Sequence, residues 1–508
     1  MEENKNNLSN KLHAICIPFP IQGHITPMLQ FAKHLNSKGF HITFFNTQHN
    51  HKCILNSKGP TALNGTPSFR YKLFSDGLPP SENDLPREVP HLLKSLEHDC
   101  LEPFLKVLLD LNQPSSGSPP ITVIISDALI PFAVKASRHI PGCSVVYFTP
   151  ASPSSFVAYS QYDTLLQRGT LPFKDPKFMT NGSLDMILDS VPPSMKGMKL
   201  KDLPSHVRTM DKNSPIFDYV RRLIARISVR PIIFNTFEAF DRESLADLST
   251  FMAGPIFTAG PLNSLSVKSE SGSTFWKEDS ECLTWLDGRR PNSVVFASFG
   301  STTLMTSEQF LEFAWGLANS KHPFLWAIRP DTVIGERAAL PVEFENEIRG
   351  RGLIVEWCPQ AEVLNHPAVG VFLTHCGWNS VLETVCSGVP VICWPYKADH
   401  QPISWWCCEK WGIGLEVSIH YDRDQVEKRI KEALETEIGV NMKKKAMEWK
   451  MLAKEAFSSS GSSTMDVNRF IDYVGSFKHK NNGSKLMELF FYPIRFCRRM
   501  MKLFVTKT

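Results

Sequence analysis

The spacing of apolar and polar residues near the N-terminus predicts alternating strands and helices. The apolar run "LHAICIPFP" predicts a buried strand, "HITPMLQFAKHLNSKG" has helical spacing and ends at Gly39, and "FHITFFNT" predicts the next strand. A strand, a helix and a second strand in this order form a βαβ unit with parallel strands. The N-terminal part of the chain is therefore expected to build an α/β sheet.

A second series of the same kind begins near residue 294. Predicted strands are "VVFASFG", "PFLWAI", "GLIVEW", "VGVFLTH", "VPVICWP" and "GIGLEV", and predicted helices are "SEQFLEFAWGLANSK" and "NSVLETVCSG". A last helical stretch is expected in "AKEAFSSSGSSTMDVNRFIDYVGSF". The pattern thus predicts two separate α/β sheets.

The segment between the two series, residues 263–280, is rich in serine and charge and has few residues to bury, which is typical of a linker. A chain of 508 residues with 42% hydrophobic residues can bury two cores. We therefore expect two domains, with the ligand in the cleft that the linker spans.

Charge and cysteine content narrow the class of protein. The 55 basic and 51 acidic residues give a net charge of +4, so nucleic acid is not an expected partner. The N-terminus is polar and the apolar run after it is interrupted by Pro18 and Pro20, so neither a signal peptide nor a membrane-spanning helix is expected. Twelve cysteines without metal-type spacing indicate reduced thiols. These features predict a cytoplasmic protein without a metal site.

The stretch "VFLTHCGWNS" has the layout of a phosphate site, a strand end that leads through a glycine into a helix N-terminus. Free N–H groups and the helix dipole attract anions at such a position. His375, Asn379 and Ser380 can add side-chain donors, and Glu383, one turn into the helix, can accept both hydroxyls of a ribose. Upstream, Trp357 offers an aromatic face for a flat base.

No dinucleotide GxGxxG and no Walker GxxxxGK[ST] motif occurs, so the chain lacks the usual phosphate loop of a Rossmann dehydrogenase or a P-loop NTPase. Each polar residue of the stretch could instead cap or pack a buried helix. Together they favour a site for a nucleotide diphosphate.

From Trp357 to Gln401 the sequence resembles the signature of the plant secondary-product glycosyltransferases, which are inverting UDP-glycosyltransferases with the GT-B fold of two facing Rossmann-like domains. The resemblance extends to "SFGS" at 298–301 and to "FPIQGHITPMLQFAKHL", and covers residues 12–477. The segments "FNTQHNHKCILNSKGP", "DGLPP" and "LKDLP" are similar to the branch that acts on terpenoids, iridoids, cyanohydrins and small phenolics.

The resemblance implies a role for each residue of the nucleotide site. Trp357 would stack on uracil, and Gln360 and Glu383 would hold the ribose. The diphosphate would be bound by four residues, which are Ser301, His375, Asn379 and Ser380.

The resemblance also implies that Asp399 and His400 bind the sugar hydroxyls and that Trp378 belongs to the UDP-sugar site. At the position of His400 the family most often has glutamine, which is associated with UDP-glucose. Histidine resembles members that use UDP-galactose or UDP-arabinose. UDP-glucose is therefore the expected donor, because it is the most frequent in the family. The histidine at position 400 makes UDP-galactose or UDP-arabinose a stronger candidate than the family frequency alone would.

An inverting sugar transfer needs one base that takes the proton of the acceptor hydroxyl. His24 opens the helix after the first predicted strand, and in "PFPIQGH" it matches the base of the family. Asp127 ends the apolar run "ITVIISD", where the family has a partner aspartate that orients the histidine. Alone, the two residues could be an ordinary helix residue and a strand-end acid.

With the resemblance, the chain divides into five expected parts. They are an acceptor-binding domain at 1–262, a linker at 263–280, a UDP-sugar-binding domain at 281–462, a return helix at 463–478 and a basic-aromatic tail at 479–508. The tail departs from the family pattern, and we expect a disordered extension. Weak contact with a membrane surface is the alternative.

The sequence thus predicts a UDP-sugar-dependent inverting O-glycosyltransferase that acts on a small lipophilic acceptor such as a terpenoid, iridoid or phenolic. No cofactor and no metal are expected, because the UDP-sugar is a substrate. The alternative from another class is a catalytically silent, nucleotide-sugar-binding regulatory protein. A UDP-sugar epimerase is a weaker option, because it needs a bound nicotinamide for which no fingerprint occurs.

Overall fold

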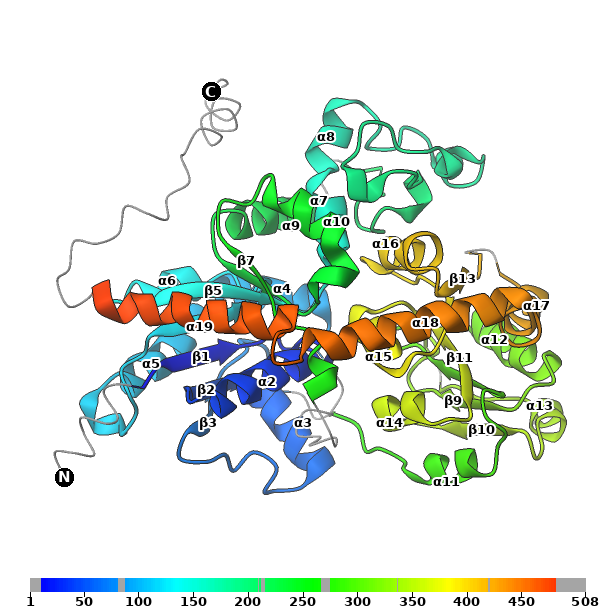
Figure 1. The fold of residues 1–508 in the computed structure, drawn as a ribbon, viewed down its shortest axis with the longest axis horizontal. Coiled ribbons are helices and arrows are strands. Elements are labelled where there is room, and N and C mark those ends of the chain that lie inside the picture. The colour runs from blue at the N-terminus through cyan, green and yellow to red at the C-terminus, as the bar shows by residue number, and fades with distance from the viewer. Residues whose placement is uncertain are drawn as a thin grey trace.

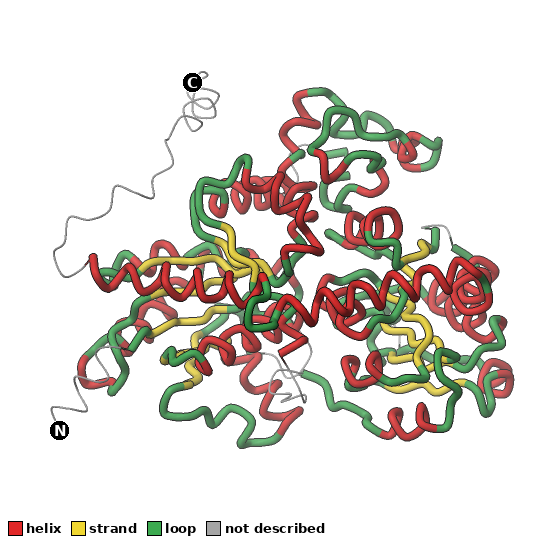
Figure 2. Tube along the Cα trace, viewed as in Figure 1, coloured by secondary structure: helices red, strands yellow, loops and turns green. Residues whose placement is uncertain are grey.

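The computed structural model describes residues 11–80, 87–208, 210–211, 215–265, 275–335, 337–418 and 421–480. It contains two parallel β-sheets, each flanked by helices, that lie side by side in the molecule (Figures 1 and 2). The expected α/β class with two Rossmann-like sheets is confirmed.

The strand orders show that both sheets are doubly wound. The N-terminal sheet has the order β3-β2-β1-β4-β5-β6-β7, and its strands are β1 His13–Ile17, β2 His41–Thr47, β3 Phe69–Phe74, β4 Val123–Asp127, β5 Ser144–Thr149, β6 Ile232–Phe234 and β7 Ile256–Thr258. The C-terminal sheet has the order β10-β9-β8-β11-β12-β13, and its strands are β8 Val294–Ser298, β9 Phe324–Ala327, β10 Gly352–Val355, β11 Val369–Thr374, β12 Val391–Cys393 and β13 Gly414–Glu416.

The central strands are apolar over most of their length because helices cover both of their faces. Every residue of β1, β4, β8 and β11 is buried. Such continuous apolar runs are typical of parallel sheets, and they explain why the sequence pattern identified these strands.

Each sheet has one point where the strand order reverses. In the N-terminal sheet the reversal lies between β1 and β4, whose last paired residues are Ile17 and Ser126. In the C-terminal sheet it lies between β8 and β11, where Ser298 pairs with Thr374. Loops diverge above such a pair of strands and leave a crevice, which is where open α/β sheets bind ligands.

A helix lies between every two consecutive strands, including between β9, β10 and β11, which the sequence pattern predicted in direct succession. In the N-terminal half they are α2 Gln22–Ser37, α3 Gln48–Lys58, α4 Val89–His98, α5 Leu101–Leu111, α6 Ala133–Ser137, α7 Pro153–Ser160, α8 Tyr162–Gln167, α9 Pro215–Ile227 and α10 Glu238–Ser249. In the C-terminal half they are α11 Glu281–Asp287, α12 Ser307–Asn319, α13 Val342–Glu347, α14 Gln360–Asn365, α15 Trp378–Ser387, α16 His400–Trp405, α17 Arg423–Glu435, α18 Glu437–Ala456 and α19 Ser462–Lys480.

Short helical turns complete the described chain. They are η1 Pro114–Ser116, η2 Pro176–Met179, η3 Ser183–Asp185, η4 Pro193–Met195, η5 Leu200–Asp202, η6 Leu262–Leu265 and the π-helical turn η7 Trp406–Lys410.

The last two helices return the chain to the N-terminal domain, and Figure 1 shows them crossing the molecule from α17 to the N-terminal sheet. Sequence analysis expected a single helical stretch here, but the structure has a break between α18 and α19 at residues 457–461. Serine and glycine, which compete with or weaken helical backbone, fill the break. Beyond it, Phe470 packs against Phe31 and Phe257, and Asp466 accepts a hydrogen bond of 2.6 Å from the backbone N–H of Thr258.

The expected linker is described only at its two ends. It starts in η6, and at the far end Phe275 is buried and its N–H donates to the side chain of Gln22 at 3.0 Å. The linker therefore contacts the start of α2 as it enters the C-terminal domain. The other domain boundaries stay a prediction, and residues 481–508 of the expected tail lie outside the described residues.

Within the described residues, the structure has no helix that is both long enough and apolar enough to cross a membrane.

Candidate active site

The candidate base and its candidate partner meet at the reversal point of the N-terminal sheet. His24 lies in the first turn of α2, directly after β1, and Asp127 is the last residue of the neighbouring strand β4. Adjacent parallel strands place both side chains at the same sheet edge, and the Nδ1 atom of His24 lies 2.7 Å from Oδ2 of Asp127.

The environment of the pair suits a base. The side chain of Asp127 is 1% exposed, and its other oxygen accepts the backbone N–H of Leu129 at 2.9 Å, whereas the side chain of His24 is 20% exposed. A carboxylate bound to Nδ1–H fixes the tautomer and leaves Nε2 with a lone pair. Phe19 packs with its ring 5.3 Å from the imidazole and limits its rotation.

The phosphate end of the candidate nucleotide site lies at the reversal point of the C-terminal sheet. Ser301 follows β8 and His375 follows β11. The imidazole of His375 fits between two glycines, because a Cβ atom on either Gly300 or Gly377 would come within 2.6 Å of the ring. Burial, and then the charge of Lys397, lower the pKa of His375 to about 3, so the ring is neutral at physiological pH.

Two cationic side chains near His375, those of Arg329 and Lys397, were not predicted from the sequence. Arg329 follows β9 and is 3% exposed, and its guanidinium donates to the carbonyl oxygens of Gly300, at 2.6 Å, and of Thr303, at 3.2 Å. Lys397 donates to Thr302 at 3.0 Å, and burial followed by Arg329 lowers the pKa of its ammonium. The two side chains fix the loop that carries Ser301, and Lys397 adds positive charge at this end of the site, whereas Arg329 is paired with Asp331 at 2.9 Å. Their position after a strand, as in "WAIRP", was the available signal.

The ribose end is assembled around a buried carboxylate. Gln360, the first residue of α14, donates to Glu383 at 2.7 Å and to Ser380 at 3.1 Å. Burial raises the pKa of Glu383 to about 7, while the bond from Gln360 opposes this shift. The three residues that the family resemblance assigned to ribose and phosphate therefore form one hydrogen-bonded group.

The candidate base-stacking residue has an aromatic neighbour from the linker. The rings of Trp357 and Trp276 lie 6.0 Å apart at an interplanar angle of 27°, and the guanidinium of Arg329 lies 5.9 Å from the ring of Trp276. The sequence pattern predicted residues 263–280 only as a linker, so a role for Trp276 beside the candidate base-stacking residue was not predicted. A lone tryptophan in a serine-rich segment was the available signal.

Two residues at the start of α15 face the N-terminal domain in this structure. The indole N–H of Trp378 donates to the carbonyl of Asn235 at 2.8 Å, and Trp378 is 4% exposed beside Phe240. The amide of Asn379 donates to the carbonyl of Gly23 at 2.6 Å. The side chain of Trp378 thus contributes to the domain interface, whereas Asn379 lies between the phosphate end and His24.

The last predicted pair, Asp399 and His400, lies where α16 begins. His400 is 9% exposed, and its ring meets that of His375 edge to face at 4.8 Å. Burial, and then His375 and Lys397, hold the pKa of His400 well below its usual value. Its Nδ1 atom accepts the N–H of Lys397 at 3.3 Å, so the proton of the neutral ring is on Nε2.

The pKa of Asp399 is influenced by the N-terminal domain. Burial raises the pKa of Asp399, and the hydroxyl of Ser155 in α7 opposes that shift. The candidate sugar-binding carboxylate therefore lies near the acceptor half of the molecule.

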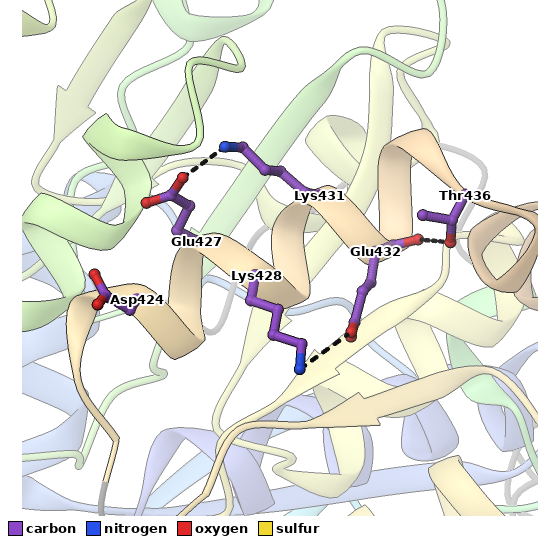
Figure 3. A pocket seen from close by; sticks show the side chains of 6 residues that line it. All are labelled: Asp424, Glu427, Lys428, Lys431, Glu432 and Thr436. Carbon is purple, nitrogen blue, oxygen red and sulfur yellow. Dashed lines mark hydrogen bonds and ion pairs between the residues drawn. The ribbon is translucent and has the colours of Figure 1, made fainter.

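A hollow of about 520 Å³ on the surface of α17 is separate from this site (Figure 3). Figure 3 shows its charged side chains paired along the helix, Lys431 with Glu427 and Lys428 with Glu432. None of its lining residues lies at a strand end, so we assign it no part in the chemistry.

Within the described residues, no group of three or more His, Cys, Asp or Glu side chains could hold a metal ion. The expectation of a reaction without metal stays a prediction.

Two doubly wound domains, one with a carboxylate-bound histidine and the other with candidate nucleotide-binding groups at its reversal point, are the arrangement expected of a nucleotide-dependent group transferase. Two family models match the chain, "Glycosyltransferase, N-terminal domain" over residues 10–190 and "UDP-glucoronosyl and UDP-glucosyl transferase" over residues 278–456. The chain belongs to the UDP-glycosyltransferase family.

Individual relatives cover nearly the whole chain. A 7-deoxyloganetin glucosyltransferase of Gardenia jasminoides is 48% identical over 466 residues, which are 90% of this chain and 96% of that protein. An (R)-mandelonitrile beta-glucosyltransferase of Prunus dulcis is 46% identical over 473 residues, 91% of this chain and 97% of that protein. Among solved structures, Os79 from O. sativa in complex with UDP matches with a TM-score of 0.73 and 26% identity, over 91% of this chain and 100% of that chain. The GT-B fold and the plant UDP-glycosyltransferase class expected from the sequence are confirmed.

Proposed function

We propose that this enzyme transfers glucose from UDP-glucose, with inversion, to a hydroxyl of a small lipophilic acceptor of the iridoid, terpenoid, cyanohydrin or phenolic kind. The contact of 2.7 Å between His24 and Asp127, at the edge that faces the nucleotide-binding domain, carries the proposal. The relatives named above, a 7-deoxyloganetin and a mandelonitrile glucosyltransferase, support both the sugar and the type of acceptor.

In the proposed reaction the acceptor hydroxyl gives its proton to Nε2 of His24 while its oxygen attacks the anomeric carbon. The bond between that carbon and the diphosphate oxygen breaks, and UDP leaves from the opposite face, which inverts the centre. Asp127 stabilises the imidazolium that forms, since its carboxylate already accepts Nδ1–H.

The other domain stabilises the leaving group. Neutral His375 can donate only one hydrogen bond, so charge neutralisation falls mainly to Lys397 and the start of α15, because Arg329 is already paired with Asp331. Preorganised cations and helix N–H groups stabilise developing negative charge without moving, which lowers the barrier.

Because position 400 is a histidine, UDP-galactose or UDP-arabinose is the second candidate donor. Its single Nε2–H cannot reproduce the two donors of the glutamine that the family most often has at this position.

A catalytically silent nucleotide-sugar-binding protein is the alternative from another class. The assembled pair of His24 and Asp127 disfavours this alternative, because a purely regulatory protein does not need a buried carboxylate that orients a partly exposed histidine.

We also propose that the enzyme works in the cytosol. None of the eleven cysteines of the described residues forms a disulfide, which fits a reducing compartment.

The test is a donor-by-acceptor screen with purified protein. UDP-glucose, UDP-galactose and UDP-arabinose are each offered with an iridoid aglycone, a cyanohydrin, a terpene alcohol and a phenol, and the products are analysed by mass spectrometry and NMR. We expect a β-glucoside from at least one acceptor. Binding of UDP-glucose without any transfer would favour the silent protein.

A further inference from the structure

One residue of the N-terminal domain satisfies both backbone polar groups of a residue in the other domain. The N–H of Ser205, which lies three residues after η5, donates to the carbonyl of Ala398 at 2.8 Å. The N–H of Ala398 donates to the hydroxyl oxygen of Ser205 at 2.7 Å. The two bonds form a closed pair across the domain interface.

Ala398 needs such support because of its backbone conformation. Its φ of 56° lies in the left-handed region, where a residue with a Cβ atom is strained. A strained backbone persists only where surrounding groups hold it. The carbonyl of Ala398 also has a second partner, since Gln401 donates to it at 3.0 Å when its amide is oriented to satisfy its neighbours. The N–H is held by the Ser205 hydroxyl.

Ala398 directly precedes the candidate sugar-binding residues, so its backbone conformation affects their orientation. The next two residues are Asp399 and His400, the pair that we assign to the sugar hydroxyls. A change of the backbone at Ala398 would rotate both side chains relative to the cleft. The orientation of the sugar-binding pair therefore depends on a hydroxyl that belongs to the acceptor half of the molecule.

The segment that carries Ser205 is firmly docked on the C-terminal domain. Lys201, in η5, donates to Glu416 at 2.9 Å, and Leu203 is fully buried. Glu416 also accepts from Ser404 in α16 at 2.7 Å. The segment and the helix that begins at His400 thus share one network, which ties the position of Ser205 to the approach of the two domains.

We propose that Ser205 is a positioning residue for the donor sugar. By holding Ala398 in its left-handed conformation it orients Asp399 and His400 once the two domains are together, so the sugar subsite is complete only when the acceptor half is docked. Ser205 does not touch the reacting atoms in this view. The inference rests on the proposed function, because it takes the UDP-sugar as the donor.

The first experiment compares Ser205→Ala with Ser205→Thr, which keeps the hydroxyl. One lost hydrogen bond predicts a loss of about threefold to tenfold in kcat/KM for the preferred UDP-sugar. UDP lacks the sugar, so its calorimetric affinity should change by less than a factor of about two. The threonine variant should recover most of the loss. Ser37→Ala, which removes a hydroxyl bonded only to His34 on an exposed helix end, is the matched control.

The second experiment tests whether Ser205 acts through Ala398. Glycine adopts a positive φ without strain, so Ala398→Gly should reduce the cost of Ser205→Ala in a double-mutant cycle. This cycle remains informative if Ser205→Ala also lowers the melting temperature, because the ratio of UDP-sugar to UDP affinity is measured on the folded protein.

Three results would overturn the inference. They are an unchanged kcat/KM in Ser205→Ala, an equal loss of UDP and UDP-sugar affinity, and strictly additive effects with Ala398→Gly. If the wild-type protein transfers sugar and any of these is seen, only the role of Ser205 is wrong. If the wild-type protein binds UDP-sugar no more tightly than UDP and transfers nothing, the proposed function falls with it.

Discussion

The amide of Asn379 donates a hydrogen bond of 2.6 Å to the carbonyl of Gly23, the residue before the candidate base. This bond joins the first turn of α15, at the phosphate end, to the first turn of α2. The spacing between the candidate phosphate end and His24 is therefore constrained by a direct bond between the two domains. Such a link holds the candidate base close to the candidate phosphate end through a direct contact between the two domains.

Replacing His24 by alanine should abolish transfer and preserve UDP binding, because the nucleotide groups lie in the other domain. Loss of a general base typically costs about 10²- to 10⁴-fold. Single-turnover transfer and calorimetric UDP affinity are the two measurements. Asp127→Asn should fall between wild type and His24→Ala, since it disturbs the tautomer and leaves the imidazole.

The control for this prediction is His91→Ala. The His91 side chain is 69% exposed on α4, and His91 is far along the chain from the strand ends that carry His24 and Asp127. Near wild-type transfer by His24→Ala to an aliphatic alcohol would show that His24 is not the base. An aliphatic alcohol is the strictest acceptor because its high pKa makes a base most necessary.

Trp378→Phe separates an interface role from a role in UDP-sugar binding. The substitution removes the N–H that satisfies the buried carbonyl of Asn235, which should cost about 1–3 kcal/mol of stability. We expect a lower melting temperature and nearly unchanged UDP affinity. A variant that melts like wild type and binds UDP much more weakly would show that Trp378 acts in nucleotide binding and not at the domain interface.

The sequence predicted the strand ends well because they follow from topology. Apolar runs identify parallel strands, and two adjacent strands bring His24 and Asp127 to one edge although 103 residues separate them. Gln360 and Glu383, which the family resemblance grouped, do form one hydrogen-bonded group.

Contacts between the domains could not be predicted in this way. The bonds from Trp378 to Asn235 and from Ala398 to Ser205 join residues that no periodicity relates. They depend on how two separately folded surfaces dock. Trp276 beside Trp357 was missed because it lies in the serine-rich segment that the pattern assigned to a linker, and the role of Trp378 in UDP-sugar binding stays a prediction.

Glu383 should make stability and UDP affinity depend on pH in opposite directions. Burial raises its pKa from 4.5 to about 7, so the folded protein binds the proton more tightly than the unfolded chain. The contribution of this residue to stability is present below pH 4.5 and is lost as the pH rises toward 7. Glu383→Gln, which stays neutral, should therefore gain melting temperature over wild type between pH 5 and 8.

UDP affinity should show the reverse trend, because the ionised carboxylate is the better acceptor for ribose hydroxyls. Wild type should bind UDP more tightly at pH 7.5 than at pH 5.5, and Glu383→Gln should bind weakly at both. UDP without its 2′-hydroxyl is the matched ligand and should show a smaller pH effect. Equal pH profiles for the two ligands would exclude Glu383 as the ribose acceptor.

His400→Gln should shift donor preference toward UDP-glucose. His400 uses Nδ1 to accept the N–H of Lys397, which leaves one donor for the sugar, whereas a glutamine amide offers two donors and an acceptor. Galactose and L-arabinopyranose share an axial 4-hydroxyl where glucose has an equatorial one, so the number and reach of donors at this position can distinguish them. The next residue does not supply the missing amide, because Gln401 is bonded to Ala398 and Arg208 when its amide is oriented to satisfy them.

The measurement is kcat/KM for UDP-glucose, UDP-galactose and UDP-arabinose with one acceptor, in wild type and in His400→Gln. One hydrogen bond contributes about 0.5–1.5 kcal/mol, so the ratio of glucose to galactose efficiency should rise by up to about tenfold. Gln401→Ala serves as the contrast, because it should loosen Ala398 and lower all three efficiencies together. An unchanged donor ratio in His400→Gln would show that this histidine does not distinguish the donor sugars, and that its buried ring instead packs against His375 and accepts the N–H of Lys397.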